Sequence, residues 1–142
     1  MRFYHRDVEY ELHDDWWAEA GMEEFVPQRP AFRAGPSDIP DRQPFELSVD
    51  QVRPLRRQLS HGVFNDSELQ GSAHDRVVQI LKGFKADNAI PPVHVARTTS
   101  GPEGPFKLVH GAHRFYCAVA TGFSHVPAVE VDDVWGDPKP ES

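Results

Sequence analysis

Apolar and polar residues alternate in several short segments of the chain, a pattern typical of half-buried β-strands. The clearest segments are residues 45–49, 93–95, 106–109 and 126–131, where valine, leucine and phenylalanine recur at alternate positions or form short runs. Residues 98–105 are rich in glycine and proline and separate the second segment from the third. We therefore predict that these two segments pair as antiparallel strands joined by a turn.

Two other segments have the spacing of amphipathic helices. Between residues 72 and 84, apolar side chains stand at i, i+3, i+4 and i+7, and residues 112–121 contain neither glycine nor proline. Gly111 precedes the second helix, where a backbone without Cβ can turn sharply, and Gly122 follows it at the expected place of a left-handed cap. The sequence thus predicts a strand, a tight turn, a helix and another strand in succession over residues 106–131.

The first 44 residues form an extension in front of these elements. Residues 7–12 alternate and predict a strand, and a short helix should follow it, capped by Asp14 or Asp15 and ended by Gly21. Residues 27–44 hold five prolines, which exclude a regular helix or a central strand. An extended connector wrapped on the core is favoured there over a lid or a partner-binding strip.

We expect these parts to form one α+β domain. A chain of 142 residues can bury roughly two-thirds of its unfolded surface, so no second domain is needed. The predicted organisation is an N-terminal strand-helix extension with its connector (1–44), a core with a small mixed sheet and flanking helices (45–131), and a tail (132–142).

The charge and composition exclude several classes of protein. A formal net charge of -7 repels the phosphate backbone, so binding to duplex DNA is disfavoured. No apolar run is long enough for a membrane helix, and the N-terminal residues lack the apolar segment of a secretory signal. Cys117 is the only cysteine, which excludes an intramolecular disulfide and fits a reducing cytoplasm. We expect a cytoplasmic protein without a membrane partner.

Polar side chains gather where the strand at 106–109 meets the helix at 112–121. His110, His113 and Arg114 surround Gly111 at this point. The first turn of a helix offers unpaired N–H donors and the positive end of its dipole, and a guanidinium adds a bidentate donor. An arginine there costs roughly 0.3–1 kcal/mol unless an anion is bound. The sequence therefore predicts a phosphate-binding turn.

This turn and its neighbours resemble the ParB/sulfiredoxin-like fold family. The stretch Gly111-Ala112-His113-Arg114 is similar to the family's Gly-x-His-Arg or Gly-Glu-Arg-Arg turn, and residues 122–127 match its Gly-x-x-x-Val-Pro exit. Residues 45–55 resemble the opening strand with its Arg-Pro, and residues 77–95 resemble a helix and second strand of the family. The resemblance covers residues 45–131 in the family's order and implies a nucleotide-binding protein.

The resemblance also implies roles for single residues. His113 and Arg114 would contact nucleotide phosphates, and Gly111 and Ala112 would supply backbone N–H groups. The first turn of the preceding helix often adds contacts, but the alignment leaves open which of residues 74–76 does so. The further candidates for cofactor binding are Arg53, Arg56 and Arg76. Arg53 and Arg56 belong to a basic run that equally fits a solvated surface.

The reaction that the resemblance favours is ATP-dependent phosphate transfer to an unknown small acceptor, or nucleotide hydrolysis. Sulfiredoxin-like repair requires a cysteine where this chain has Ala112. A kinase would need Mg²⁺ and a carboxylate near the acceptor hydroxyl. The catalytic candidates are His113, Asp50 and Asp75, with Asp66 and Glu68 as alternatives.

Two other functions and one other kind of site stay open. A regulatory protein could keep the fold and bind a partner through its N-terminal extension, which carries Trp16 and Trp17. A ParB-like nuclease is disfavoured by the acidic net charge. Zinc could be bound by residues near the turn, but phosphate binding already explains His113, so we predict no metal site. The zinc candidates are His110, His113, Cys117 and His125.

Overall fold

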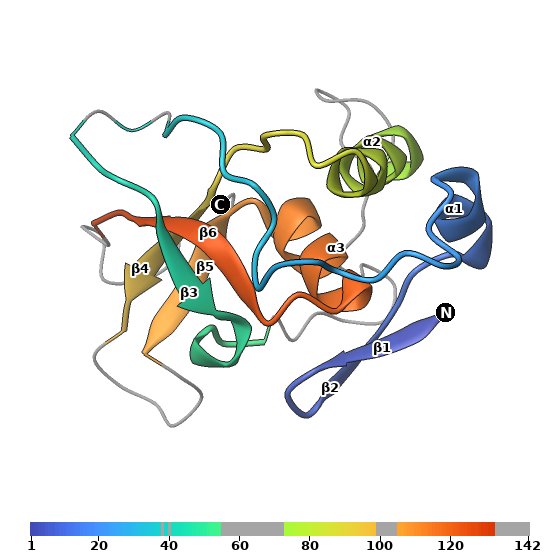
Figure 1. Cartoon of the computed structure of the whole chain (residues 1–142). Coiled ribbons are helices and arrows are strands. Elements are labelled where there is room, and N and C mark those ends of the chain that lie inside the picture. The colour runs from blue at the N-terminus through green and yellow to red at the C-terminus, as the bar shows by residue number, and fades with distance from the viewer. Residues whose placement is uncertain (38, 40, 55–72, 99–104, 133–142) are drawn as a thin grey trace.

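The elements of the predicted core are present in the computed structural model, which describes residues 1–37, 39, 41–54, 73–98 and 105–132. Arg56, Asp66, Glu68 and residues 133–142 of the predicted tail lie outside the described residues. The described residues form an α+β structure with three α-helices, a two-stranded hairpin and a four-stranded mixed sheet (Figure 1).

The mixed sheet has the spatial order β3-β6-β4-β5. Its central pair, β4 and β6, is parallel, and both outer pairs are antiparallel. The pairing of β4 with β5 confirms the predicted antiparallel pair. The strands are β3 (Phe45–Ser48), β4 (Val93–Arg97), β5 (Phe106–His110) and β6 (His125–Glu130).

The sheet is strongly curved, so its two edge strands approach each other. The rings of Phe45 and Phe106, the first residues of β3 and β5, have centroids 6.2 Å apart. After β3 the chain makes a short 3-10 helix, η1 (Val49–Gln51), and Val52 then bridges to Phe106. Val49 therefore opens this turn. The alternation predicted it as the last residue of the strand, which is wrong by one residue.

Both predicted core helices are confirmed. Helix α2 (Ala73–Lys85) buries the face predicted from its apolar spacing, including Val77, Leu81 and Phe84. Helix α3 (Ala112–Thr121) connects β5 to β6 and begins and ends at the predicted residues. It lies in the middle of the molecule, between the sheet, α2 and the N-terminal hairpin (Figure 1).

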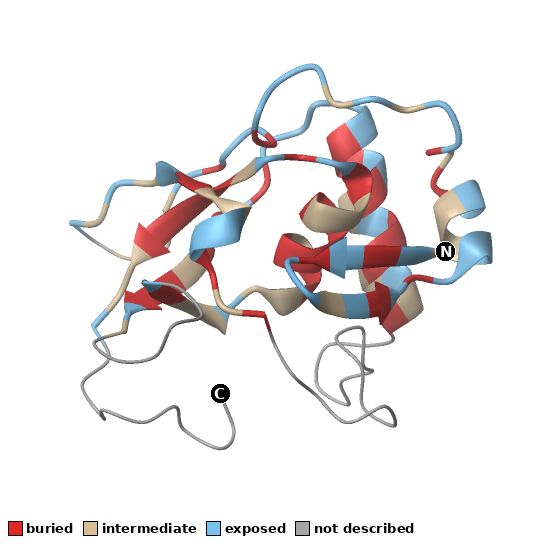
Figure 2. Ribbon diagram, turned by 90° about the horizontal axis from the view of Figure 1, so that it is seen from below, coloured by how far each residue is buried: buried red, intermediate tan, exposed pale blue. Residues whose placement is uncertain are grey.

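The N-terminal extension holds one more strand than the sequence predicts. Strand β2 (Val8–Glu11) is the predicted one, and β1 (Arg2–His5) pairs with it antiparallel. The short helix α1 (Asp14–Glu19) follows, and none of its residues is buried (Figure 2). The predicted cap at Asp14 or Asp15 is wrong by one or two residues, because His13 occupies the cap without a side-chain hydrogen bond.

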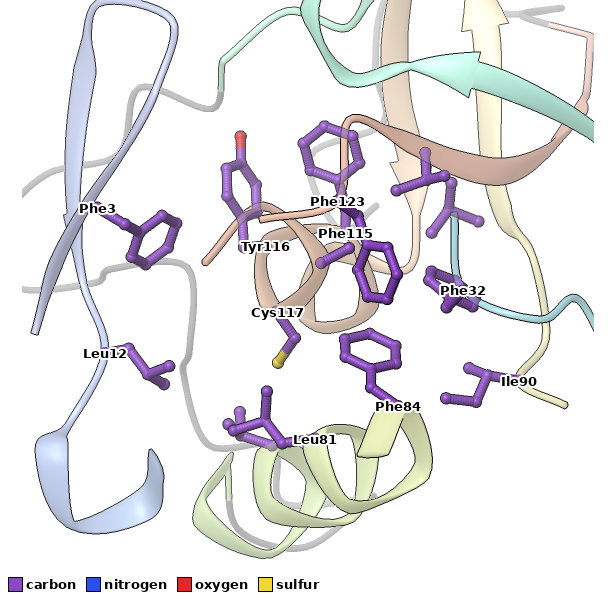
Figure 3. Close-up of a cluster of buried hydrophobic side chains, with 14 of the residues drawn as sticks. Phe3, Leu12, Phe32, Leu81, Phe84, Ile90, Phe115, Tyr116, Cys117 and Phe123 are labelled. Atoms are coloured by element: carbon purple, nitrogen blue, oxygen red, sulfur yellow. The ribbon is translucent and has the colours of Figure 1, made fainter. Parts of the chain in front are cut away.

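The connector wraps on the core as predicted. Its described residues form neither a helix nor a named strand. The backbone of Ile90 donates to the carbonyl of Arg33 at 2.9 Å and accepts from the N–H of Gly35 at 2.8 Å. The ring of Phe32 packs beside those of Phe84 and Phe123, with centroids 5.0 and 6.3 Å away (Figure 3). The connector is thus part of the hydrophobic core.

A buried histidine fastens the N-terminal hairpin to the core. Nε2 of His5 donates to the carbonyl of Val49 at 2.8 Å, and Nδ1 lies 3.3 Å from the hydroxyl of Tyr116. Because a carbonyl only accepts, the proton of the neutral ring is on Nε2, and Nδ1 accepts from Tyr116. The hydroxyl of Tyr10 lies 3.2 Å from that of Tyr116 and extends the network to β2.

We expect this network to make folding sensitive to acid. Burial is the main cause that lowers the pKa of His5 in the folded protein below its usual 6.5. The unfolded chain therefore binds more protons, and the contribution of His5, complete above pH 6.5, is lost as the pH falls through the lowered pKa. Thermal denaturation between pH 8 and 5 should show the loss in wild type and a flatter profile in His5→Leu.

His74 contributes to the pH dependence of stability with the sign opposite to that of His5, so a variant of each histidine must be compared. The hydrogen bond to Glu19 is the main cause that raises the pKa of His74, whose contribution is therefore complete below pH 6.5 and lost as the pH rises through the raised pKa. His74→Ala should leave the acid loss intact. A wild-type profile that His5→Leu does not flatten would contradict the assignment to His5.

Candidate functional site

The predicted phosphate turn is built around Gly111, between β5 and α3. Gly111 has φ +98°, a left-handed backbone that favours glycine. Its carbonyl accepts the first hydrogen bond of α3, from the N–H of Phe115 at 2.9 Å. A Cβ at this position would lie 2.9 Å from Nη2 of Arg114 and 3.0 Å from Cγ1 of Val93. Glycine therefore permits both the turn and the close approach of these two side chains.

The imidazole of His113 meets a second basic side chain. His113 is the second residue of α3, is only 8% exposed, and accepts at Nδ1 from Nη2 of Arg76. Arg76 lies in the first turn of α2, so this contact joins the N-terminal turns of two packed helices. The sequence left open which of residues 74–76 contacts the turn. In the structure it is Arg76.

Arg114 lies beside the same turn and also supports the sheet. Its Nη2 donates to the carbonyl of Pro92 at 3.5 Å, just before β4 begins, and its Nε is shielded from solvent. The side chain as a whole is partly exposed. Arg114 therefore differs from the freely solvated arginine of a helix surface, because it is held against the backbone next to Gly111.

The arrangement is suited to an anion. Arg76 and His113 meet where the first turns of α2 and α3 pack together, and Arg114 lies beside Gly111 in the same turn of α3. The dipoles of both helices add positive potential there. Guanidinium groups are planar, stay charged and hydrogen-bond two phosphate oxygens at once. Chemically, the site can hold a phosphate and stabilise negative charge that develops on it.

The other two candidates in the first turn of α2 make different contacts. Nε2 of His74 donates to a carboxylate oxygen of Glu19 at 2.8 Å, so this side chain fastens α1 to α2. Asp75 lies 3.3 Å from Nδ1 of His74 and its side chain is 78% exposed. Asp75 is thus next to Arg76 in sequence and accessible, while His74 is occupied with the N-terminal extension.

Two candidates lie away from this turn. Asp50 is exposed in η1, and the structure shows its N–H donating to Oγ of Ser48. The N–H of Arg53 donates to the carbonyl of Phe106 at 2.9 Å. Phe106 begins β5 and Gly111 follows its end, roughly 16 Å further along the strand at 3.3 Å per residue. The backbone of Arg53 is therefore at the opposite end of β5 from the turn.

The zinc candidates are not gathered around one point. The ring of His110 lies 5.2 Å from that of His94, between centroids, and is tilted by 45°. His125 contacts Ser124 at the start of β6, and burial raises the pKa of the Cys117 thiol. Within the described ranges, no three His, Cys, Asp or Glu residues are placed to hold a metal ion together. In this same part of the chain, no helix is long and apolar enough to cross a membrane.

Two features near the extension were missed from the sequence. The ring of Trp16 lies 4.5 Å from that of His13 and 5.5 Å from that of His74, between centroids. The spacing of His13 and Trp16, three residues apart at a helix start, was the available signal. A shallow hollow is also present beside the last turn of α2, about 13 Å along the helix from Arg76. Its lining residues are Gly21, Glu23, Glu24, Phe25, Val26, Gln28 and Lys85.

Comparisons of the chain with protein-family models, with curated proteins and with solved structures find no match.

Proposed function

We propose that this protein binds a nucleotide through its phosphates at the Gly111 turn and acts as an ATP-dependent phosphotransferase on a small acceptor, or as a nucleotide hydrolase. The observation that carries the proposal is the contact between Arg76 and His113, which places two basic side chains at the joined first turns of α2 and α3. Arg114 lies on the same turn. ATP and Mg²⁺ are the proposed cofactors, in a cytoplasmic setting.

The resemblance to the ParB/sulfiredoxin-like fold supports this proposal and limits its chemistry. The turn lies between a strand and a helix, as the resembled motif requires. The sulfiredoxin reaction needs a reactive thiolate, but Ala112 replaces the cysteine, and Cys117 is fully buried with a raised pKa. Phosphate chemistry on a nucleotide is therefore favoured over sulfinic acid repair.

The residues present fit a nucleotide phosphate chain. Arg76, Arg114 and the backbone of the turn would bind and orient the phosphates, and His113 would donate from Nε2, because its Nδ1 accepts from Arg76. Mg²⁺ supplies charge neutralisation on the phosphates when it is bound with them. Among the described carboxylate candidates, Asp75 is the one on the helix turn that carries Arg76, so it is our candidate base for the acceptor.

The proposal predicts that Arg76 is needed for binding. Arg76→Ala should weaken ATP binding about tenfold or more, because a hydrogen bond to a charged group contributes roughly 1.5–3 kcal/mol. Calorimetric titration of ATP and CTP, each with and without Mg²⁺, into wild type, Arg76→Ala and Arg114→Ala would measure this. Lys82→Ala is the matched control, since Lys82 is an exposed cation on the same helix.

Thermal denaturation of each variant separates a lost contact from a lost fold. Weaker binding by a folded Arg76→Ala, with Lys82→Ala unchanged, would support the site and justify a screen of acceptors. If wild type binds neither nucleotide, or if Arg76→Ala binds as wild type does, the proposed site is wrong.

A regulatory protein on the same fold is the second candidate. The N-terminal extension exposes two large apolar side chains, Tyr4 at 62% and Val26 at 64%, which suit contact with a protein partner. Nucleotide binding without phosphate transfer to any tested acceptor would favour this candidate. A nuclease remains the least favoured proposal because of the net charge of -7.

A further inference from the structure

The first turn of α2 joins two different clusters of side chains. Arg76 reaches α3 and contacts His113, whereas His74 reaches α1 and contacts Glu19 and Trp16. Two positions apart on a helix, the Cα atoms of His74 and Arg76 are separated by about 5 Å. Residues two apart on a helix do not face each other, so the proposed phosphate site and the aromatic cluster lie on different sides of the same first turn of α2.

The aromatic cluster consists of His13, Trp16 and His74. The indole is tilted by 45° from the ring of His13 and by 49° from that of His74, with centroids 4.5 and 5.5 Å away. Trp16 is partly exposed, and the side chain of His74 is 39% exposed. The 2.8 Å hydrogen bond from His74 to Glu19 holds α1 in this place beside α2 (Figure 1). The cluster is thus held beside α2 and partly accessible to solvent.

We propose that this cluster binds the base of the nucleotide, with Trp16 as the stacking surface. The inference rests on the proposed function, because it places the phosphates at Arg76, His113 and Arg114. A nucleotide carries a flat aromatic base on the same molecule as its phosphates, and bases stack on indole rings irrespective of base identity. The large π-surface of tryptophan gives the strongest contact of this kind.

The inference changes the role of the N-terminal extension. The extension would complete the ligand site, because α1 supplies the base contact while α2 and α3 supply the phosphate contacts. Stacking tolerates every base, so ATP and CTP should bind with similar affinity. Specificity would then lie in the presence of a base and a phosphate chain together, which defines the ligand class as a nucleoside polyphosphate.

The test compares ATP with inorganic tripolyphosphate, which has the phosphates but no base. Both are titrated by calorimetry into wild type, Trp16→Leu and Trp16→Phe. Leucine keeps an apolar side chain at the α1–α2 contact and removes the ring, and phenylalanine keeps a smaller ring. We expect Trp16→Leu to weaken ATP about tenfold and to leave tripolyphosphate unchanged, with partial recovery in Trp16→Phe.

The outcomes separate this inference from the proposed function. Equal weakening of ATP and tripolyphosphate by Trp16→Leu, or no change for either ligand, overturns the base contact while the phosphate site stands. If wild type binds neither ligand, both proposals fail. Should Trp16→Leu not fold, His13→Ala at the exposed side of the cluster provides the same comparison, and selective weakening of ATP is again the expected result.

Discussion

Replacing Phe115 by alanine should lower the free energy of unfolding by about 3–5 kcal/mol, the cost of a fully buried phenylalanine that leaves a cavity. Phe115 is 0% exposed in the centre of the core (Figure 3). Its ring packs edge-on against His5 at 5.0 Å and Tyr116 at 4.9 Å, between centroids. Its N–H makes the first helical hydrogen bond to Gly111. The substitution removes the ring contact with His5 and therefore loosens the attachment of the hairpin, whereas the backbone hydrogen bond to Gly111 is kept.

Urea denaturation followed by circular dichroism measures this loss. With a slope of roughly 1–3 kcal/mol per molar urea, the midpoint should fall by about 1 M or more. Phe45→Ala is the matched control, because it is the same chemical change at a ring that is 37% exposed. A Phe115→Ala midpoint no lower than that of Phe45→Ala would show that α3 is not the centre of the folded core.

The helices of the core could be predicted because their signals are local. The apolar spacing of α2 and the two glycines that flank α3 lie within the helices or next to them. The order of the sheet has no such signal, since the parallel pairing of β4 with β6 joins residues more than thirty positions apart. Sequence alternation therefore located the strands, and the turn at residues 98–105 predicted the pairing of β4 with β5, but the other neighbours in the sheet were left undetermined.

Strand β1 was missed for a physical reason. Phe3 and His5 face the core while Arg2 and Tyr4 are exposed, so the strand does alternate. Histidine reads as polar and tyrosine as partly apolar, which hides the pattern. The network that satisfies His5 involves Val49 and Tyr116, which are distant in sequence. A buried polar residue of this kind becomes recognisable only when its partners are known.

In the candidate site too, features set by neighbouring residues could be predicted, and features set by residues distant in sequence could not. The Gly111 turn could be predicted because its residues are consecutive. The choice of Arg76 over His74 depends on which face of α2 meets α3, and helix packing decides that. The backbone of Arg53 proved to lie beside the start of β5, because the chain crosses from one sheet edge to the other after η1.

Gly111→Ala should both destabilise the protein and weaken nucleotide binding. Alanine in a left-handed backbone costs about 1–2 kcal/mol. The added methyl group would also lie 2.9 Å from Nη2 of Arg114, the end of a flexible side chain that would have to move, and 3.0 Å from Cγ1 of Val93, which would have to give by a few tenths of an ångström. The arginine that must move is one of the proposed phosphate contacts. Chemical denaturation and ATP titration measure the two effects.

Gly122→Ala separates backbone strain from the effect on the site. Gly122 caps the other end of α3 with φ +106°, and the nearest atom to an added Cβ would be Cγ of Pro27 at 3.9 Å. This control has a similar backbone cost, no steric conflict and no proximity to the turn. It should lose about 1–2 kcal/mol and keep full affinity for ATP. Equal affinities in the two variants would mean that the position of Arg114 does not matter for binding, and the phosphate site would then have to be placed elsewhere.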